Sequence, residues 1–285
     1  MIVKKDQPFS ERPIIVVLYG LPGSGKTSLS NTSENNILID CDRGADRAIN
    51  KVDTIQANKW SDVLSDESEI QNYSTVTIDT AKSMLDDFLM IHVCDKDNKL
   101  KWNKLKAYGA IGEEFKMFVN RRRAEGIDII IIAHSREEKD GDNITVVPDI
   151  TGQSKSLLLR IADQVGYISI ENGQRVLSFE PDGKHIGKNV AQIQKMIIPN
   201  SDDSRFDSSM ANIISKIKSM IKSNSDKAIE IEKQKSIEID NEVSQVFETK
   251  TLDELKDLFI SLKYRNEPKV YNAKDEQKLK LSKKK

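Results

Sequence analysis

The chain has 285 residues, of which 38% are apolar and 31% are charged, and its formal net charge is −1 at pH 7. This length suits one substantial α/β domain with an appendage, and the near-zero net charge excludes a general electrostatic attraction to nucleic acid. Cys41 and Cys94 lack metal-ligand or disulfide spacing, which predicts reduced thiols in the cytoplasm. The sequence has no apolar run of about 20 residues, so we expect no membrane partner.

The first predicted element is a strand over residues 14–18, an unbroken aliphatic run typical of a parallel strand that is buried on both faces. It leads directly into a segment that matches G-x-x-x-x-G-K-[ST] at every position, which is the pattern of a phosphate-binding loop. Glycines let the backbone N–H groups of such a loop point at bound phosphates, whereas a chance glycine-rich turn explains a match of this length poorly. The residues expected to bind nucleotide are Gly20, Leu21, Pro22, Gly23, Ser24, Gly25, Lys26, Thr27 and Ser28.

Two side chains of this loop have predicted chemical roles. Lys26 is expected to act as a catalytic cation at the terminal phosphates, and Thr27 to give its hydroxyl oxygen to Mg2+. A further predicted strand, residues 76–78, ends at Asp79, on the sheet edge where open α/β folds bind ligands. Strands also end in Asp because Asp suits turns. Next to a phosphate loop, however, Asp79 is the expected second residue of a metal site, with ATP and Mg2+ as the cofactors.

Hydrolysis needs a carboxylate that orients or deprotonates the attacking water, and we expect this acid to be Asp42. The position after Asp79, where many relatives of such folds carry glutamate, is occupied by Thr80. Asp42 follows the predicted strand 37–39, whose end also faces the γ-phosphate. On local grounds, an Asp that starts a turn before Gly44 is an equally good interpretation.

The most apolar segment, residues 127–133, is predicted to be another strand and leads into His134. If this strand lies beside the first one, His134 is placed to donate a hydrogen bond to the γ-phosphate, and we include it among the catalytic residues. The alternative is a histidine that merely caps a strand.

These motifs together resemble the RecA-type ATPase core, and most closely the small RecA-like phage recombinases classed with the Sak single-strand annealing proteins. The resemblance covers residues 13–199 and rests on the phosphate loop, on Ile39-Asp40-Cys41-Asp42, on Ile78-Asp79-Thr80 and on the strand that ends in His134. It implies an α/β fold, a RecA-like P-loop NTPase core with a mainly parallel central sheet. It places Asp42 where such cores carry an Asp-x-Glu acid, and His134 where they commonly carry a glutamine that links the γ-phosphate to a DNA-binding loop.

The resemblance further implies ATP hydrolysis coupled to binding of single-stranded DNA, in recombination or annealing. Assembly as a homo-oligomer or filament, a single-strand-binding protein as partner and a phage gene expressed in the host cytoplasm are expected with it. The alternatives are an accessory ATPase of replication or protein remodelling that does not bind DNA directly, and, less favoured, a small-molecule kinase.

Two segments are candidates for contact with DNA. Residues 136–156 are rich in turn formers and are expected to be a mobile, non-helical loop. Residues 95–108 interleave lysines with Trp102 and Tyr108, a pattern that suits phosphate neutralisation and base stacking, although Trp102 packing inward is nearly as good an interpretation. By position alone, Lys184 or Lys188 is a candidate for reaching the γ-phosphate of a neighbouring subunit.

Composition divides the chain into a predicted core (1–199), a helical appendage (200–263) and a basic tail (264–285) that we expect to be disordered. The appendage is predicted from two apolar helix faces, one of which begins at Met210, while the other follows a capping box that begins at Thr251. An Asn-Gly pair at 172–173 predicts a β-hairpin within the core.

Overall fold

The computed structural model describes residues 4–8 and 11–283 and divides the chain into two compact units. One unit is Glu11–Ile221, and the other combines Met1–Ser10 with Lys222–Lys285. The division falls inside helix α7 (Ser209–Glu248) and not in the predicted linker that follows residue 199. The reason is that the first turns of α7 bury Met210 and Ile217 in the core of the Glu11–Ile221 unit.

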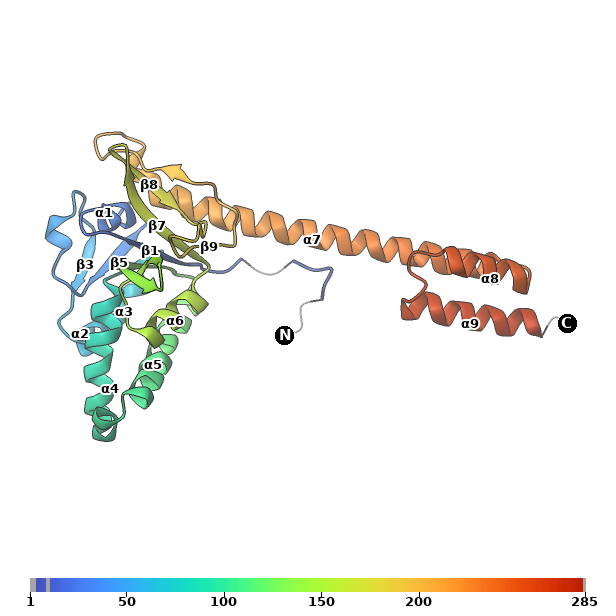
Figure 1. Ribbon diagram of the computed structural model, residues 1–285, viewed down its shortest axis with the longest axis horizontal. Coiled ribbons are helices and arrows are strands. Elements are labelled where there is room, and N and C mark those ends of the chain that lie inside the picture. Colours follow the sequence, from blue (N-terminus) through green and yellow to red (C-terminus); the bar gives the residue numbers. More distant parts are fainter. Residues whose placement is uncertain (1–3, 9–10, 284–285) are drawn as a thin grey trace. The chain divides into compact units, whose positions relative to one another are not determined.

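The Glu11–Ile221 unit is built around a mixed sheet of mostly parallel strands (Figure 1). The strand order is β10-β8-β7-β1-β5-β4-β2-β3, with β6 paired to β5 and β9 paired to β7. The strands are β1 (Ile15–Gly20), β2 (Asn36–Asp40), β3 (Asp53–Gln56), β4 (Thr75–Asp79), β5 (Asp128–Asp140), β6 (Asn143–Pro148), β7 (Gln164–Glu171), β8 (Gln174–Ser178), β9 (Lys188–Asn189) and β10 (Met196–Ile197). The sequence predicts β1, β2, β4 and the first half of β5, and it misses β3.

The register of the parallel strands brings their polar carboxyl ends together. Gly20 at the end of β1 is paired with His134 in β5, and Asp40 at the end of β2 is paired with Asp79 at the end of β4. Because β5 lies between β1 and β4, these residues all reach one edge of the sheet. The adjacency of β1 and β5 fulfils the condition on which the prediction for His134 rests.

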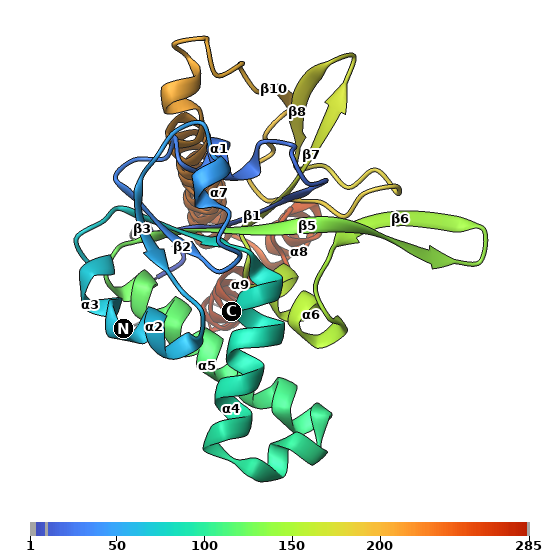
Figure 2. The ribbon, with the colours of Figure 1, turned by 90° about the vertical axis from the view of Figure 1, so that its left-hand side faces the viewer.

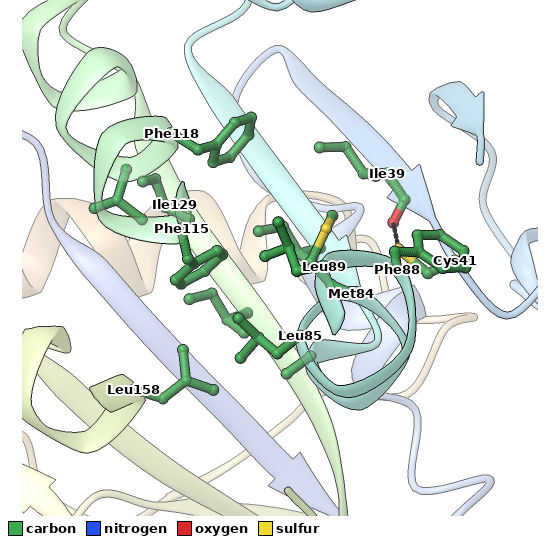
Figure 3. Packing of buried hydrophobic residues seen from close by; sticks show 14 of the residues in the cluster. Ile39, Cys41, Met84, Leu85, Phe88, Leu89, Phe115, Phe118, Ile129 and Leu158 are labelled. Carbon is green, nitrogen blue, oxygen red and sulfur yellow. Dashed lines mark hydrogen bonds between the residues drawn. The ribbon is translucent and has the colours of Figure 1, made fainter. Parts of the chain in front are cut away.

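Both faces of the sheet are buried, which explains the unbroken apolar runs of β1 and β5. Alternate residues of β1 point to opposite faces: Ile15 and Val17 belong to one buried cluster, whereas Val16 and Leu18 belong to the other. Figure 3 shows the first cluster, where Phe115 and other side chains from the helices pack against the strands. The predicted α/β architecture, with a mainly parallel sheet and helices after the core, is confirmed.

Helices cover the sheet on both sides. The first cluster contains residues of α2 (Trp60–Ser65), α3 (Glu67–Ile70), the π-helical η2 (Ser83–Leu89), α4 (Met90–Lys96), α5 (Lys104–Ala124) and α6 (Gly152–Ile161). The second contains residues of α1 (Lys26–Ser30) and of the start of α7. Short 3-10 turns occupy η1 (Ala45–Arg47), η3 (Asn98–Trp102) and η4 (Phe206–Ser208).

The prediction of a mobile, non-helical loop over residues 136–156 is wrong for most of this segment. Strand β5 continues past the sheet edge and pairs antiparallel with β6, so that the two form a ribbon that extends away from the sheet (Figure 2). The turn formers are confined to the ribbon's tip, where Gly141 has a φ of 58° between the paired residues Asp140 and Asn143. Helix α6 then begins at Gly152.

The predicted hairpin around the Asn-Gly pair is confirmed. Strands β7 and β8 pair antiparallel, with Glu171 opposite Gln174, and the two intervening residues both have positive φ. Asn172 and Gly173 adopt values of 50° and 77°, as a two-residue hairpin turn requires. The hairpin lies next to β1 through β7, so it borders the phosphate loop.

The second unit is helical and includes residues that the sequence assigns to a disordered tail. It contains the later part of α7, together with α8 (Leu252–Ser261) and α9 (Pro268–Ser282) (Figure 1). The apolar residues of these helices form a separate core. Thr251 and Glu254 form the predicted capping box at the start of α8. Helix α9 contradicts the disorder prediction for residues 268–282, because Val270, Leu281 and the side chain of Gln277 are buried despite the many lysines around them. Residues 284–285 lie outside the described part of the chain.

Within residues 4–8 and 11–283, no helix is both long enough and apolar enough to cross a membrane.

Candidate nucleotide-binding site

The phosphate loop has a backbone that only glycine allows at several positions. A Cβ atom on Gly20 would lie 2.5 Å from the carbonyl oxygen of Ile168 in the neighbouring strand. Gly23 and Gly25 have φ values of 77° and 85°, in the left-handed region that other residues rarely adopt. The two glycines of the pattern, together with Gly23 between them, therefore hold a conformation that larger residues would strain.

Lys26 lies inside this loop with its ammonium group turned back onto the backbone. Nζ donates hydrogen bonds to the carbonyl oxygens of Gly20 at 3.0 Å and Leu21 at 2.8 Å, and Ser24 Oγ lies 3.4 Å away. Burial lowers the pKa of Lys26 from its ordinary value of 10.5 to about 8, and the nearby carboxylate of Asp79 opposes this shift. The ammonium group is thus held where bound phosphates are expected, with few water molecules around it.

Thr27 and Asp79, which the sequence assigns jointly to Mg2+, lie in direct contact. Thr27 Oγ1 donates a hydrogen bond of 2.6 Å to Oδ2 of Asp79. Burial raises the pKa of Asp79, the hydrogen bond from Thr27 opposes the rise, and the negative charge of Asp42 adds to it. The two oxygens are therefore preset side by side beneath the phosphate loop.

This pair of oxygens fits Mg2+ and does not fit a metal that is held by protein ligands alone. Among the residues that the structure describes, no group of three or more histidine, cysteine or acidic side chains is arranged to hold a metal ion. Mg2+ keeps several water ligands and is commonly bound through one or two protein oxygens together with the phosphates of the substrate. Thr27 and Asp79 offer this kind of partial shell.

Asp42 lies at the same edge of the sheet and has two hydroxyl partners. Thr80 Oγ1 donates to Oδ2 of Asp42 at 3.0 Å, and the Ser83 hydroxyl donates to Oδ1. The carboxylate is exposed, so water reaches it, while the two hydroxyls hold its plane in one orientation. Thr80 directly follows Asp79, at the position where many relatives of such folds carry a glutamate. Its hydroxyl helps to orient Asp42, the predicted catalytic acid.

The turn that follows β2 is organised by Asp40 and not by Asp42. Asp40 is buried, and its carboxylate accepts hydrogen bonds from the backbone N–H groups of Gly44 at 3.0 Å and Ala45 at 2.9 Å. A carboxylate that accepts such bonds satisfies the turn by itself. Asp40 therefore has the turn-forming role that the alternative interpretation gives to Asp42. The carboxylate of Asp42 does not bond to the backbone of this turn and is held by Thr80 and Ser83 instead.

His134 is half-buried in β5, opposite Gly20 in the register. Its Nδ1 atom is buried and has no hydrogen-bond partner among the described residues. The strand-capping alternative predicts a side chain with satisfied hydrogen bonds, and this ring lacks such a bond at Nδ1. His134 therefore presents an unused polar atom beside the phosphate loop. Its backbone carbonyl is occupied, since it accepts a bond of 2.8 Å from the N–H of Asp149.

The remaining predicted residues differ in position. Leu21 is 61% exposed, and the adjacent Pro22 is exposed as well. Ser28 accepts a bond of 3.3 Å from the N–H of Ile49, which fixes its hydroxyl at the start of α1. The ammonium group of Lys188 donates hydrogen bonds within its own chain, to carbonyl oxygens at the end of α6 that include that of Leu159 at 3.3 Å.

The lysine-rich segment 95–108 consists of the end of α4, η3 and the start of α5. Trp102 is 91% exposed, so its ring points outward and not into the core. Tyr108 behaves differently, because it packs against the main buried cluster. The segment forms part of the projection of α4 and α5 in Figure 2, and Trp102 is its exposed aromatic residue.

Sequence reasoning missed two residues of the site. Ser83 stands in η2, and nothing in its local sequence links it to Asp42. Arg175 stands in β8, and its guanidinium group lies against Gly25 of the phosphate loop. Both contacts arise from packing of elements that are distant in the sequence, so no local sequence motif predicts them.

Comparison with known proteins agrees with this geometry. The sequence profile of the AAA domain family matches residues 12–191, the part of the chain that contains the whole site described above. No curated protein matches the chain. The matched region spans more than half of the 285 residues and includes the phosphate loop, Asp79 and His134. The chain therefore belongs to the AAA domain family, a family of P-loop ATPases.

Proposed function

We propose that this protein binds ATP with Mg2+ and hydrolyses it. The observation that carries the proposal is the arrangement of Lys26, Thr27 and Asp79, in which a buried ammonium group and a preset pair of oxygens meet at one phosphate loop. Such a site favours a polyphosphate with a hard divalent cation, because each charge of the ligand meets a partner of opposite sign.

The residues of the chain divide the work of hydrolysis. Lys26 exchanges its bonds with the carbonyls of Gly20 and Leu21 for phosphate oxygens. Asp42, held by two hydroxyls, orients the attacking water and accepts its proton. His134 donates to the γ-phosphate from the ring that now has an unpartnered nitrogen. Mg2+, when bound at Thr27 and Asp79, supplies positive charge that neutralises the phosphates.

We further propose that hydrolysis is coupled to binding of single-stranded DNA. The ribbon of β5 and β6 continues directly from His134, so that one strand connects the γ-phosphate position with an exposed surface. Trp102, at 91% exposure, stands among Lys99, Lys101 and Lys104. A base stacked on such a ring gains about 1–3 kcal/mol, and the lysines neutralise phosphates of the strand.

We also propose a role in DNA recombination or annealing. In this role the chain forms an oligomer or filament and has a single-strand-binding protein as partner. This proposal rests on the resemblance to the RecA-like phage recombinases. That resemblance lies in the phosphate loop, in the Asp42 and Asp79 strand ends and in His134. An assembled ring or filament seen by electron microscopy with ATP and single-stranded DNA, and absent without them, supports this finer proposal. A chain that stays monomeric under both conditions contradicts it.

The test of coupling is ATP hydrolysis measured with and without single-stranded DNA, at two salt concentrations. We expect stimulation by DNA that weakens at high salt, loss of stimulation in Trp102→Ala, and its retention in Trp102→Phe, which keeps a stacking ring. Hydrolysis without stimulation and without salt-sensitive binding would instead indicate the accessory ATPase that acts on another partner. No hydrolysis in the wild type would contradict the ATPase itself.

A further inference from the structure

Arg175 of the β7–β8 hairpin lies against the phosphate loop. A Cβ atom built on Gly25 would lie 2.9 Å from Nε and 3.2 Å from Cδ of Arg175. Gly25 directly precedes Lys26, so the guanidinium group is adjacent to the part of the loop that surrounds bound phosphates. This contact comes from the same subunit, because the hairpin and the loop are joined through β7 and β1.

Arg175 is half-buried, and its guanidinium group lacks hydrogen-bond and ion-pair partners among the described residues. Its Nε atom is buried and has no hydrogen-bond partner, and no acidic group pairs with Arg175 in the described ranges. Glu171, the acidic residue of the same hairpin, is engaged by Lys195 at 2.7 Å. Buried polar atoms are nearly always hydrogen-bonded, so an unsatisfied arginine donor beside the phosphate loop points to a site for an anionic ligand.

The charges around the loop make the same point. Two cations, Lys26 and Arg175, lie close to one short loop, while the nearby carboxylate of Asp79 is engaged by a hydrogen bond from Thr27. The planar guanidinium group matches the geometry of phosphate oxygens and binds them in a fork, whereas Lys26 acts as a point charge. A polyphosphate chain in the loop would satisfy both cations at once.

We propose that Arg175 is a second phosphate-binding cation, which the β7–β8 hairpin supplies to the polyphosphate chain of the nucleotide bound in the same subunit. The proposal rests on nucleotide binding at the phosphate loop, as proposed above. It differs from the expectation that a lysine after β8 completes the site of a neighbouring subunit, because the group acts within its own chain. Nucleotide binding then ties the hairpin to the loop.

The experiment measures the affinity for ATP, and for inorganic tripolyphosphate by competition, in the wild type and three variants. Arg175→Ala is expected to weaken both ligands about ten- to a hundred-fold, as expected for loss of a hydrogen bond to a charged group. Arg175→Lys is expected to lose less, because it keeps the charge without the fork. Gln174→Ala, an exposed neighbour on the same strand, serves as the matched control and is expected to bind like the wild type.

Thermal unfolding without nucleotide separates binding from folding. Removal of an unpartnered guanidinium group is expected to leave the melting temperature of Arg175→Ala unchanged or slightly raised. A large fall in that temperature overturns the proposal, since it assigns Arg175 to the fold. Weakened ATP with unchanged tripolyphosphate overturns it too, because the contact is then with the base or ribose. A wild type that binds neither ligand contradicts the nucleotide site itself, whereas normal binding by Arg175→Ala contradicts only the inference.

Discussion

The hydroxyl of Thr27 donates a 2.6 Å hydrogen bond to Asp79, which joins the start of α1 to the end of β4 before any ligand is present. The proposed metal ligands therefore need little rearrangement on binding. Burial raises the pKa of Asp79 and thus disfavours its charged form, whereas the hydrogen bond from Thr27 opposes this shift. This relationship leads to the first prediction.

Asp79→Asn is expected to fold at least as stably as the wild type while losing activity. The amide removes a poorly solvated negative charge, so the melting temperature without nucleotide should stay the same or rise. The rate of ATP hydrolysis should fall by about a hundred-fold or more, because a neutral amide binds Mg2+ more weakly than a carboxylate does, so less positive charge faces the phosphates. Differential scanning fluorimetry and a phosphate-release assay measure the two effects, with the exposed Asp46→Asn as control. A fall in stability together with normal turnover would contradict the assignment.

The affinity for ATP is expected to decrease as the pH rises through 8 and beyond. Burial lowers the pKa of Lys26 to about 8, and phosphate oxygens stabilise its charged form, so binding raises this pKa. At pH values between the pKa of Lys26 in the free protein and its higher pKa in the complex, ATP binding is accompanied by uptake of a proton. The affinity for ATP therefore falls as the pH rises through this range. Calorimetry in two buffers of different ionisation enthalpy measures the uptake. Lys26→Arg, which stays charged throughout, should lose this pH dependence.

Asp42→Asn is expected to lower the rate constant of hydrolysis and to leave nucleotide affinity within a few-fold. Loss of a positioned acid–base group typically costs about 10²- to 10⁴-fold in rate. Ser83→Ala removes one of the two hydroxyls that orient Asp42, so a smaller loss of rate is expected. Single-turnover kinetics and equilibrium binding of ATP separate the two quantities. If Asp42→Asn hydrolyses ATP at the normal rate, the acid must be another residue.

Gly20→Ala is expected to destabilise the Glu11–Ile221 unit. The added Cβ would lie 2.5 Å from the backbone oxygen of Ile168, a contact that requires the strands to shift, at a cost of about 1–3 kcal/mol. Gly109→Ala is the matched control, because nothing lies within 4 Å of its Cβ position and it stands inside helix α5. There the substitution should stabilise by up to about 1 kcal/mol. Urea denaturation of both variants tests the difference.

Gln277→Leu is expected to destabilise the helical unit that contains α9. The side-chain amide donates to the carbonyl oxygens of Phe247 at 3.1 Å and Thr249 at 2.8 Å, at the end of α7. Leucine leaves these acceptors without a partner, at a cost of about 1–3 kcal/mol. Lys278→Leu, an exposed change next to it, should have little effect. Hydrogen exchange of residues 268–282 measures the stability of this helix directly.

The local part of the site follows from sequence because the phosphate loop is a continuous motif. Its strand, its glycines and Lys26 are neighbours in the chain. The role of each in binding phosphate can be argued from its residue type and position without knowledge of the fold. The contact between Thr27 and Asp79 needs one more assumption, that two parallel strands end at the same edge, and the register of β1, β5 and β4 satisfies it.

The parts that sequence missed depend on packing between distant segments. Arg175 reaches Gly25 only because β7 lies beside β1, and nothing in the hairpin sequence indicates this neighbour. The many lysines of residues 264–285 predict disorder, whereas residues 268–282 form helix α9. Two of them, Lys274 and Lys280, instead lie over aromatic rings, with Lys274 at 4.0 Å from the ring centre of Tyr271. The composition of a segment gives the number of its charged residues. It does not show which apolar surfaces the aliphatic parts of the lysine side chains cover.

The strand that carries the phosphate loop lies between two strands encoded much later in the chain. Ile15–Gly20 pairs on one side with residues 129–134 and on the other with residues 164–168, and the N–H of Ile15 is bound by the carboxylate of Asp163. During synthesis, the earliest element of the core must therefore wait until about residue 168 has left the ribosome before both of its edges are paired. The nucleotide site, whose loop precedes most of this unit in the sequence, is among the last parts of the unit that the growing chain can complete.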